Sequence, residues 1–173
     1  MFLKEIKLKS IFLFILVFLS FDIFASSPVE MFNNLINQNL SFTQKSLNSE
    51  TVDLSISDGS VIRDNSSIII NIERPYRERY TLNNSSIEIY DFDFDQTKIL
   101  SYKDIDNITF IDILMKGINL DIANVKDISI NSFKVVDSSS REIYIELTSA
   151  DSFFIKFKDN MNIINLVNFK VSE

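Results

Sequence analysis

The carboxylates are the side chains of this sequence that come closest to a known site pattern. Asp91, Asp93 and Asp95 occupy alternate positions in the segment YDFDFDQ, as the first ligands of an EF-hand calcium loop do. The sixth position of that loop needs glycine and the twelfth needs glutamate, but this chain has Gln96 and Tyr102 there. We therefore expect a solvent-exposed turn without a bound metal.

Catalytic chemistry has few other side chains available. The chain contains no histidine and no cysteine, which excludes imidazole bases, thiol nucleophiles and zinc sites of the His/Cys type. No lysine follows a serine by three residues, the spacing that a Ser-Lys pair needs on one helical turn. Paired carboxylates for glycoside hydrolysis remain an open alternative. We expect a protein that is not an enzyme and that uses no cofactor or metal.

Charge and composition exclude two further classes of protein. The 24 acidic residues outnumber the 17 basic ones, and no basic stripe interleaved with aromatic residues is visible along the sequence. A net charge of −7 repels phosphate backbones, so we expect no binding to nucleic acid. Hydrophobic residues make up 46% of the chain, which supplies a core and excludes intrinsic disorder.

The first 25 residues have the pattern of a secretory signal. Three lysines precede the apolar run IFLFILVFL of Ile11 to Leu19, and a small residue, Ala25, follows it. The run is shorter than the ~20 residues that span a bilayer, although an uncleaved membrane anchor stays an alternative. We expect cleavage after Ala25 and a single domain over residues 26–173. Without a cysteine to carry lipid, that domain is expected to be free in the periplasm.

Two short amphipathic helices are predicted. The first begins at Ser27-Pro28-Val29-Glu30, where Ser27 can cap, proline fits the first turn and Glu30 stands where a capping box needs a carboxylate. Its apolar stripe is Phe32, Leu35, Ile36 and Leu40. The second ends at Gly117 and carries Ile108, Ile111, Leu114 and Met115 at helical spacing.

The rest of the chain alternates with a period of two, which is typical of half-buried strands. Strands are expected over residues 68–73, 80–82, 87–90, 98–102, 133–136, 143–147, 153–157 and 163–171, and Asn83-Asn84-Ser85-Ser86 joins two of them as an antiparallel hairpin. The pattern predicts a mainly β fold, a meander of eight to ten antiparallel strands in one curved sheet whose apolar inner face the two helices cover. Because bulky Ile and Phe side chains would line that face, an incompletely filled half-barrel with a lipid pocket is expected.

Several of these residues together resemble the outer-membrane lipoprotein carrier family, LolA. The family pattern is an F-x-Q element, then R-P-x-x-F-R-W, then Y-D-x-x-x-x-Q. This sequence has Ser41-Phe42-Thr43-Gln44, then Arg74-Pro75 and Arg79-Tyr80, then Tyr90-Asp91 and Gln96, in the same order. Glu78 stands where the family usually has phenylalanine, and Tyr80 replaces tryptophan. The resemblance covers about residues 28–102.

The resemblance implies an unclosed antiparallel β-barrel, a half-barrel whose hydrophobic cavity is lidded by the short helices. Members of the family are periplasmic chaperones that take acylated lipoproteins from the inner-membrane ABC transporter LolCDE and pass them to the outer-membrane acceptor LolB. The acceptor is anchored through a cysteine, so the lack of one favours the carrier. A monomer is expected. The alternative is a protein of the same fold that binds another lipid or amphiphile without lipoprotein traffic.

The resemblance also assigns site residues. Arg74 matches the family arginine that bonds the lid backbone and holds the empty cavity shut, and alternation from Ile68 through Ile72 places it on the inner face. Arg77, Glu78 and Arg79 are expected at the cavity mouth and partner surface. The expected cavity residues are Phe32, Leu35, Ile36, Phe42, Ile68, Ile70, Ile72, Tyr80, Ile111 and Met115.

Overall fold

A computed structural model describes residues 26–48, 51, 53–64, 66–104, 109–120, 124–136, 140–159 and 161–172. The predicted signal segment 1–25 and Ile108 lie outside these residues. All the strands and helices named below fall between Pro28 and Val171, so residues 26–173 contain them all. No helix in the described part of the chain is both long enough and apolar enough to cross a membrane.

Eleven strands form one antiparallel sheet in the described chain. Their order is β6-β5-β4-β3-β2-β1-β11-β10-β9-β8-β7, so the chain starts in the middle, runs outward to one edge and returns inward from the other. The strands are β1 Leu40–Asn48, β2 Asp53–Asp64, β3 Ser67–Arg74, β4 Glu78–Leu82, β5 Ser86–Asp91, β6 Gln96–Ser101, β7 Asn124–Ser129, β8 Ser132–Val136, β9 Glu142–Leu147, β10 Ser152–Lys158 and β11 Ile164–Val171.

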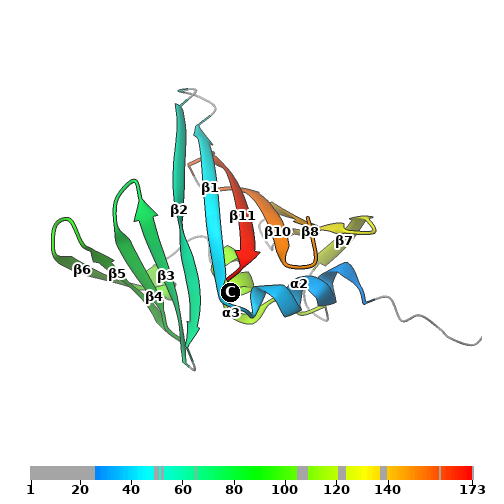
Figure 1. Ribbon diagram of the computed structural model, residues 1–173, viewed down its shortest axis with the longest axis horizontal. Helices are drawn as coiled ribbons and strands as arrows, with labels where there is room; N and C mark the ends of the chain where they lie inside the picture. Colours follow the sequence, from blue (N-terminus) through cyan, green and yellow to red (C-terminus); the bar gives the residue numbers. More distant parts are fainter. Residues whose placement is uncertain are drawn as a thin grey trace, which may run out of the picture.

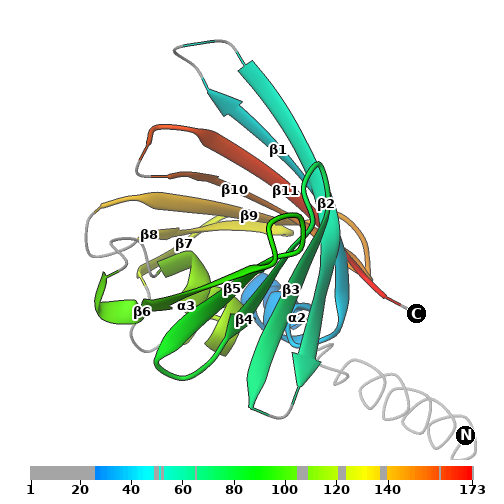
Figure 2. The ribbon, with the colours of Figure 1, turned by 90° about the vertical axis from the view of Figure 1, so that its left-hand side faces the viewer.

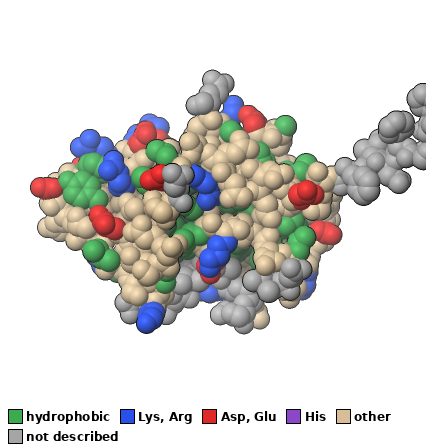
Figure 3. Space-filling view, turned by 90° about the horizontal axis from the view of Figure 1, so that it is seen from below, with side chains coloured by type: hydrophobic (Ala, Val, Ile, Leu, Met, Phe, Trp, Pro, Cys, Tyr) green, Lys and Arg blue, Asp and Glu red, His purple; other side chains and the backbone are tan. Residues whose placement is uncertain are grey.

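The sheet is strongly bent and does not close. Its end strands β6 and β7 lie at opposite ends of the molecule (Figure 1), and both halves bend toward the same side (Figure 2). The predicted unclosed antiparallel half-barrel with two short helices is therefore confirmed. Seen from below, this molecule carries basic and acidic side chains intermixed, with hydrophobic side chains in small groups between them (Figure 3).

Helix α2, Pro28–Ile36, begins as predicted. The Ser27 hydroxyl oxygen accepts a hydrogen bond from the Glu30 amide at 3.1 Å, and Pro28 occupies the first turn, where its missing N–H is not needed. The helix is shorter than the apolar stripe suggested. Leu40, expected as its last apolar position, opens β1 instead and is fully buried there.

The core extends beneath both helices, and its aromatic part lies between α2 and the half of the sheet made of β1 and β8–β11. The Phe32 ring meets Phe133 at 5.8 Å and Phe153 at 5.1 Å between centroids, both edge to face. All three of these side chains are fully buried. Phe153 also stacks on Phe169 at 4.9 Å. Helix α2 is therefore fixed to the sheet by close-packed aromatic rings.

A β-bulge interrupts the pairing of β2 with β3. Gly59 is paired with Ile72, but its neighbour Asp58 is paired with Arg74, so Glu73 is the extra residue. A Cβ atom at Gly59 would lie 1.9 Å from the Asn71 carbonyl oxygen, so the two backbones approach too closely for any side chain. Beyond the bulge, the alternation of faces along β3 reverses.

Three strands were not anticipated individually, and the described sheet has eleven strands where eight to ten were expected. Strands β1, β2 and β7 received no bounds, and β2 and β7 carry mostly exposed or half-buried side chains. Burial alternates cleanly in β9 and in most of β11, which is why the sequence pattern located those strands.

Candidate functional site

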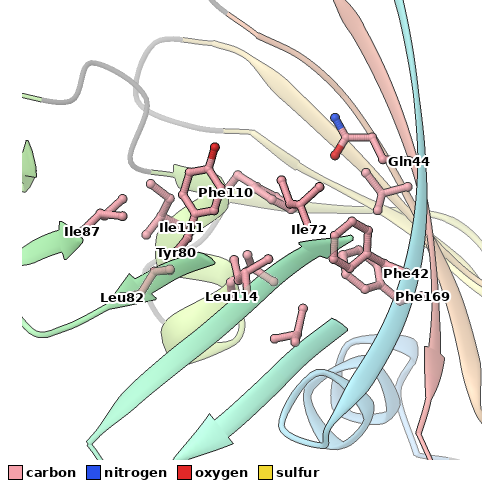
Figure 4. Close-up of a pocket in the computed structure, with 13 residues that line it drawn as sticks. Phe42, Gln44, Ile72, Tyr80, Leu82, Ile87, Phe110, Ile111, Leu114 and Phe169 are labelled. Atoms are coloured by element: carbon pink, nitrogen blue, oxygen red, sulfur yellow. The ribbon is translucent and has the colours of Figure 1, made fainter. Parts of the chain in front are cut away.

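A cavity of about 270 Å³ lies between α3, Thr109–Lys116, and the inner face of the sheet. Its lining is apolar except for one amide and one phenol, those of Gln44 and Tyr80. Figure 4 shows Phe42, Gln44 and Phe169 on one side of the cavity and Tyr80, Leu82, Ile87 and Ile111 on the other. The complete lining is Phe42, Gln44, Val61, Ile70, Ile72, Tyr80, Leu82, Ile87, Phe110, Ile111, Leu114, Val167 and Phe169.

The polar groups next to the cavity are bonded among themselves. The Gln44 amide donates to Ser46 Oγ at 2.8 Å and to Asn165 Oδ1 at 3.0 Å. The Asn165 amide in turn donates to Asp159 Oδ2 at 3.3 Å and to the Ile163 carbonyl at 3.2 Å. Because these donors and acceptors are satisfied, the cavity presents an apolar surface at little polar cost.

The rim of the cavity bears a carboxylate. Glu78 is paired with Ile72 across β3 and β4, so its side chain lies on the inner face, and its Oε2 accepts a hydrogen bond from the Tyr80 hydroxyl at 2.6 Å. Burial, followed by this bond to Glu78, raises the pKa of Tyr80 above its ordinary value. Tyr80 therefore stays a neutral donor over the physiological range.

Helix α3 contacts both halves of the sheet. On one side the Phe110 ring stacks on Phe157 of β10 at 4.6 Å. On the other side the 3-10 turn Tyr102–Asp104 follows β6, and the Tyr102 hydroxyl approaches Met115 Sδ at 3.1 Å while also bonding the Asn83 carbonyl at 2.6 Å. Phe110, Ile111 and Met115 remain only partly buried.

The chain after α3 is bonded to α2. The Asn33 side chain donates to the Ile118 carbonyl at 2.9 Å and accepts from the Ile118 amide at 2.8 Å. Because that amide bonds Asn33, it does not bond the Leu114 carbonyl four residues before it. Gly117 lies between the end of α3 and Ile118, and its φ of +69° lets the chain turn there. The sequence predicted that the helix ends at this residue.

Arg63 of β2 donates a hydrogen bond to the Leu114 carbonyl, which has no bond from the Ile118 amide. Its Nη2 donates to the Leu114 oxygen at 2.6 Å, close to the helix end where a cation is favoured. Its Nε is buried and has no hydrogen-bond partner among the described residues. Burial lowers the pKa of Arg63. The side chain as a whole is half-buried, so the one unmet donor offsets part of the stabilisation from the bond to Leu114 and does not cancel it.

Arg74 does not have the position that was expected of it. Its Nε donates to Asp58 Oδ1 at 2.7 Å, and 77% of its side chain is exposed. The prediction assumed unbroken alternation along β3, but the bulge at Glu73 puts Arg74 on the same face as Asp58. That is the outer face, because Asp58 is paired with Thr43, the outward neighbour of Phe42. In this structure the arginine that bonds α3 is Arg63.

Arg77 and Arg79 also point away from the cavity. Their guanidinium carbons lie 5.7 and 5.3 Å from the centroid of the Phe92 ring, and Arg79 Nε donates to Asn71 Oδ1 at 3.1 Å. Of the three residues expected at the mouth, Glu78 alone lies beside the cavity lining. The assignment of all three to a partner surface stays a prediction.

Half of the expected cavity residues line the cavity, namely Phe42, Ile70, Ile72, Tyr80 and Ile111. Phe32, Leu35 and Ile36 are instead buried in the core beneath α2, Ile68 is buried on β3 opposite Leu82, and Met115 packs against the core beside Tyr102. The expectation was wrong for the three residues of α2 because both helices were treated as covers of one cavity, and Ile68 and Met115 lie outside the lining. The roles of the five lining residues in binding a ligand stay predictions.

Sequence reasoning missed the lining residues from strands that are distant in the chain. Val167 and Phe169 of β11 reach the cavity because β11 pairs with β1, where Phe169 lies opposite Phe42. Their alternation was recognised, but no local signal indicates which strand is their neighbour. Phe110 and Leu114 could have been found from the amphipathic pattern that located Ile111.

The acidic segment after β5 forms a turn, as expected. Asp91 Oδ1 accepts hydrogen bonds from the amides of Asp93 and Phe94, and Asp95 accepts from the Tyr90 hydroxyl at 2.6 Å. Within the described ranges, no group of three or more acidic side chains is arranged to hold a metal ion.

Among known proteins, this chain finds likeness only at the level of solved structures, and that likeness is distant. No family profile and no curated protein matches the sequence. Among solved structures, a LolA superfamily protein from Nitrosomonas europaea superposes with a TM-score of 0.47 at 8% identity, over 86% of this chain and 95% of that one. At this score and identity the likeness does not establish membership of the family.

Proposed function

We propose that this protein binds acyl chains in the cavity beneath α3. The observation that carries the proposal is a lining whose side chains are apolar except for Gln44 and Tyr80, covered by a helix whose Phe110 and Ile111 are only partly buried. Such a lining stabilises a hydrocarbon chain through the area it removes from water, and it offers no side chains for catalysis. The role is therefore that of a carrier rather than an enzyme.

The size of the cavity supports a lid that moves. Its volume of about 270 Å³ lies at or below the low end of ligand pockets, which run from about 300 to 1,000 Å³. Loading a full acyl chain therefore requires α3 to shift from the sheet. The bond from Arg63 to Leu114 and the Phe110 stack on Phe157 would break first. Ligand binding would then favour the open state by its differential affinity.

We further propose that the cargo is acylated lipoprotein in transit between two membranes. At ~0.8 kcal/mol per CH₂, a 16-carbon chain costs on the order of 12 kcal/mol in water, so lipoproteins need a carrier to cross an aqueous compartment. The sequence resemblance supports LolCDE as donor, LolB as acceptor, a signal peptide in residues 1–25 and a monomer working in the periplasm. A second candidate is another amphiphile held in the same cavity, which the Glu78 carboxylate at the rim favours where the head group is cationic.

Filling the cavity tests acyl binding. Ile72→Trp places a larger side chain in the lining, and we expect it to weaken binding of a fluorescent 16-carbon fatty acid at least tenfold. Ile62→Trp is the matched control, because Ile62 lies on β2 beside the lining residue Val61 but is 40% exposed. Fluorescence titration and a thermal melt are recorded for both. Unchanged binding in a folded Ile72→Trp protein would contradict the proposed site.

Lipoprotein release tests the cargo. Purified residues 26–173 are added to spheroplasts of the host, and the soluble fraction is probed for acylated lipoproteins. We expect a soluble complex with the unaltered chain and none with Ile72→Trp. Fatty-acid binding without any lipoprotein release would favour the second candidate.

A further inference from the structure

The outer face of the sheet carries a row of lysines that is invisible along the sequence. Strand register places Lys45 opposite Leu166, Leu166 opposite Lys156, and Lys156 opposite Tyr144. Tyr144 is opposite Lys134, and Lys134 is opposite Lys126. We call these four lysines the lysine row. They come from β1, β10, β8 and β7, and directly paired residues point to the same face.

The row lies opposite the cavity. Ile155 and Val167, the neighbours of Lys156 and Leu166 in sequence, point inward and are buried. Successive side chains of a strand alternate between faces, so the lysine row points away from α2 and α3. The outer face is thus a surface distinct from the acyl site, and its properties do not depend on the proposed function.

The charge of this face opposes that of the whole chain. Lys158 adjoins the row, and within it the one acidic partner that forms an ion pair is Glu142, which bonds Lys134 at 2.7 Å. Among the described residues no ion pair is formed by Lys45, Lys126, Lys156 or Lys158. The net charge of the chain is −7, and basic and acidic groups are intermixed on the underside (Figure 3). Glu146 lies on the same face and accepts a hydrogen bond from the Tyr144 hydroxyl at 2.8 Å. Five lysines against these two glutamates still make a local positive surface.

Apolar side chains lie between these lysines. A hollow of about 590 Å³ lies among them, lined by the apolar side chains Tyr144, Phe154, Phe157, Ile164 and Leu166, by Lys134, Lys156 and Lys158, and by Glu142, which is paired with Lys134. The same face continues onto β2, where Ile56 lies opposite Lys45 and Leu54 lies opposite Leu47. Ile56 and Leu54 are 51% and 60% exposed. The face thus combines cationic groups with exposed hydrocarbon.

We propose that this outer face docks on a bilayer surface that contains anionic phospholipids. Lysine ammonium groups would contact the phosphates while their aliphatic stems, with Leu54 and Ile56, enter the boundary between head groups and acyl chains. A lipid head group would bind in the hollow that Tyr144 and Phe154 help to line. A bilayer offers phosphates and hydrocarbon side by side across a broad surface, and this face presents lysines and exposed aliphatic side chains across several paired strands, which is why the observations favour a membrane.

The test uses residues 26–173 and sedimentation with vesicles of phosphatidylcholine, alone or mixed equally with phosphatidylglycerol. We expect binding to the mixed vesicles only, weakening as salt is raised. The double variant K156Q/K158Q should bind about 25-fold more weakly, on the order of fivefold per lysine. The control K98Q/K103Q changes the net charge equally at exposed positions of β6 and the turn after it, and should bind normally.

A second pair of variants tests the apolar contribution. L54S/I56S should weaken vesicle binding several-fold, whereas I99S/L120S, which removes two equally exposed aliphatic side chains elsewhere, should not. Equal binding to neutral vesicles, no binding to either kind, or equal losses in test and control variants would overturn the proposal. So would binding of soluble glycerol phosphate without binding of vesicles. The variant I72W, which fills the inner cavity, should still bind vesicles, so failure of the acyl site and failure of this surface are distinguishable.

Discussion

Helices α2 and α3 cover the same inner face of the sheet, but they contact it in different ways. Phe32 and Ile36 of α2 are fully buried, and the Phe32 ring is held by Phe133 and Phe153. Helix α3 buries Ile113 and Leu114 in the core but lies over a cavity, with Phe110 and Ile111 only partly buried. The two helices therefore differ in how fully their inner faces are packed, and the proposed function assigns the movement to α3.

The aromatic residues of the two helices should differ most in their effect on stability. Phe32→Ala leaves a cavity in a close-packed core and should lower the free energy of unfolding by about 3–5 kcal/mol. Phe110→Ala removes one stacked pair, which contributes about 0.5–1.5 kcal/mol beyond the area it buries, at a partly buried position, so it should cost clearly less than Phe32→Ala. Urea denaturation measures both values. Equal losses would mean that α3 is core as well.

The two arginines at β2 and β3 should differ in ligand kinetics. Arg63→Met breaks the bond to the Leu114 carbonyl, and since bonds to charged groups contribute about 1.5–3 kcal/mol, the open state should become ~10- to 100-fold more populated. The association rate of the fatty acid should rise accordingly in stopped-flow measurements.

Arg74→Met is the matched control for that experiment. It removes an exposed ion pair with Asp58, worth about 0–1 kcal/mol, on the face away from α3. Its association rate should stay that of the unaltered chain. If Arg74→Met accelerated loading and Arg63→Met did not, the assignment of the α3 contact to Arg63 would be wrong.

The smallest expected effect is on how the free energy of unfolding depends on pH, through Tyr80 beneath α3. The folded-state pKa of Tyr80 is raised by burial and by Glu78, whereas an unfolded tyrosine titrates near about 10. The neutral phenol therefore contributes its full stability below about pH 10, and the contribution is lost as the pH rises above that value. Tyr80→Phe should reduce the decline in unfolding free energy between neutral and alkaline pH. An identical decline in both proteins would contradict the buried, hydrogen-bonded phenol.

Local signals explain what the sequence predicts correctly. The start of α2 follows from Ser27, Pro28 and Glu30 because capping acts within four residues. The end of α3 follows from Gly117 in the same way. The inward set of β3, Ile68 to Ile72, follows from strict alternation.

The errors come from contacts between distant segments. Arg74 was misplaced because the bulge depends on Gly59 approaching the Asn71 carbonyl of the next strand, which no periodicity indicates. The lysine row was missed because it exists only across six paired strands. The role of Arg63 depends on Asn33, which accepts the hydrogen bond from the Ile118 amide. The Leu114 carbonyl is therefore free to accept a hydrogen bond from Arg63 of β2.

Hydrogen exchange resolved by peptide tests the difference between the helices most directly. The amides of α2 and α3 are compared in the empty protein and after addition of a dipalmitoylated peptide. We predict that α3 exchanges at least tenfold faster than α2 when the cavity is empty, and that the peptide changes exchange in α3 while leaving α2 unaltered. Equal protection of both helices, with no response of α3 to the acylated peptide, would contradict α3 as the movable cover of an acyl site.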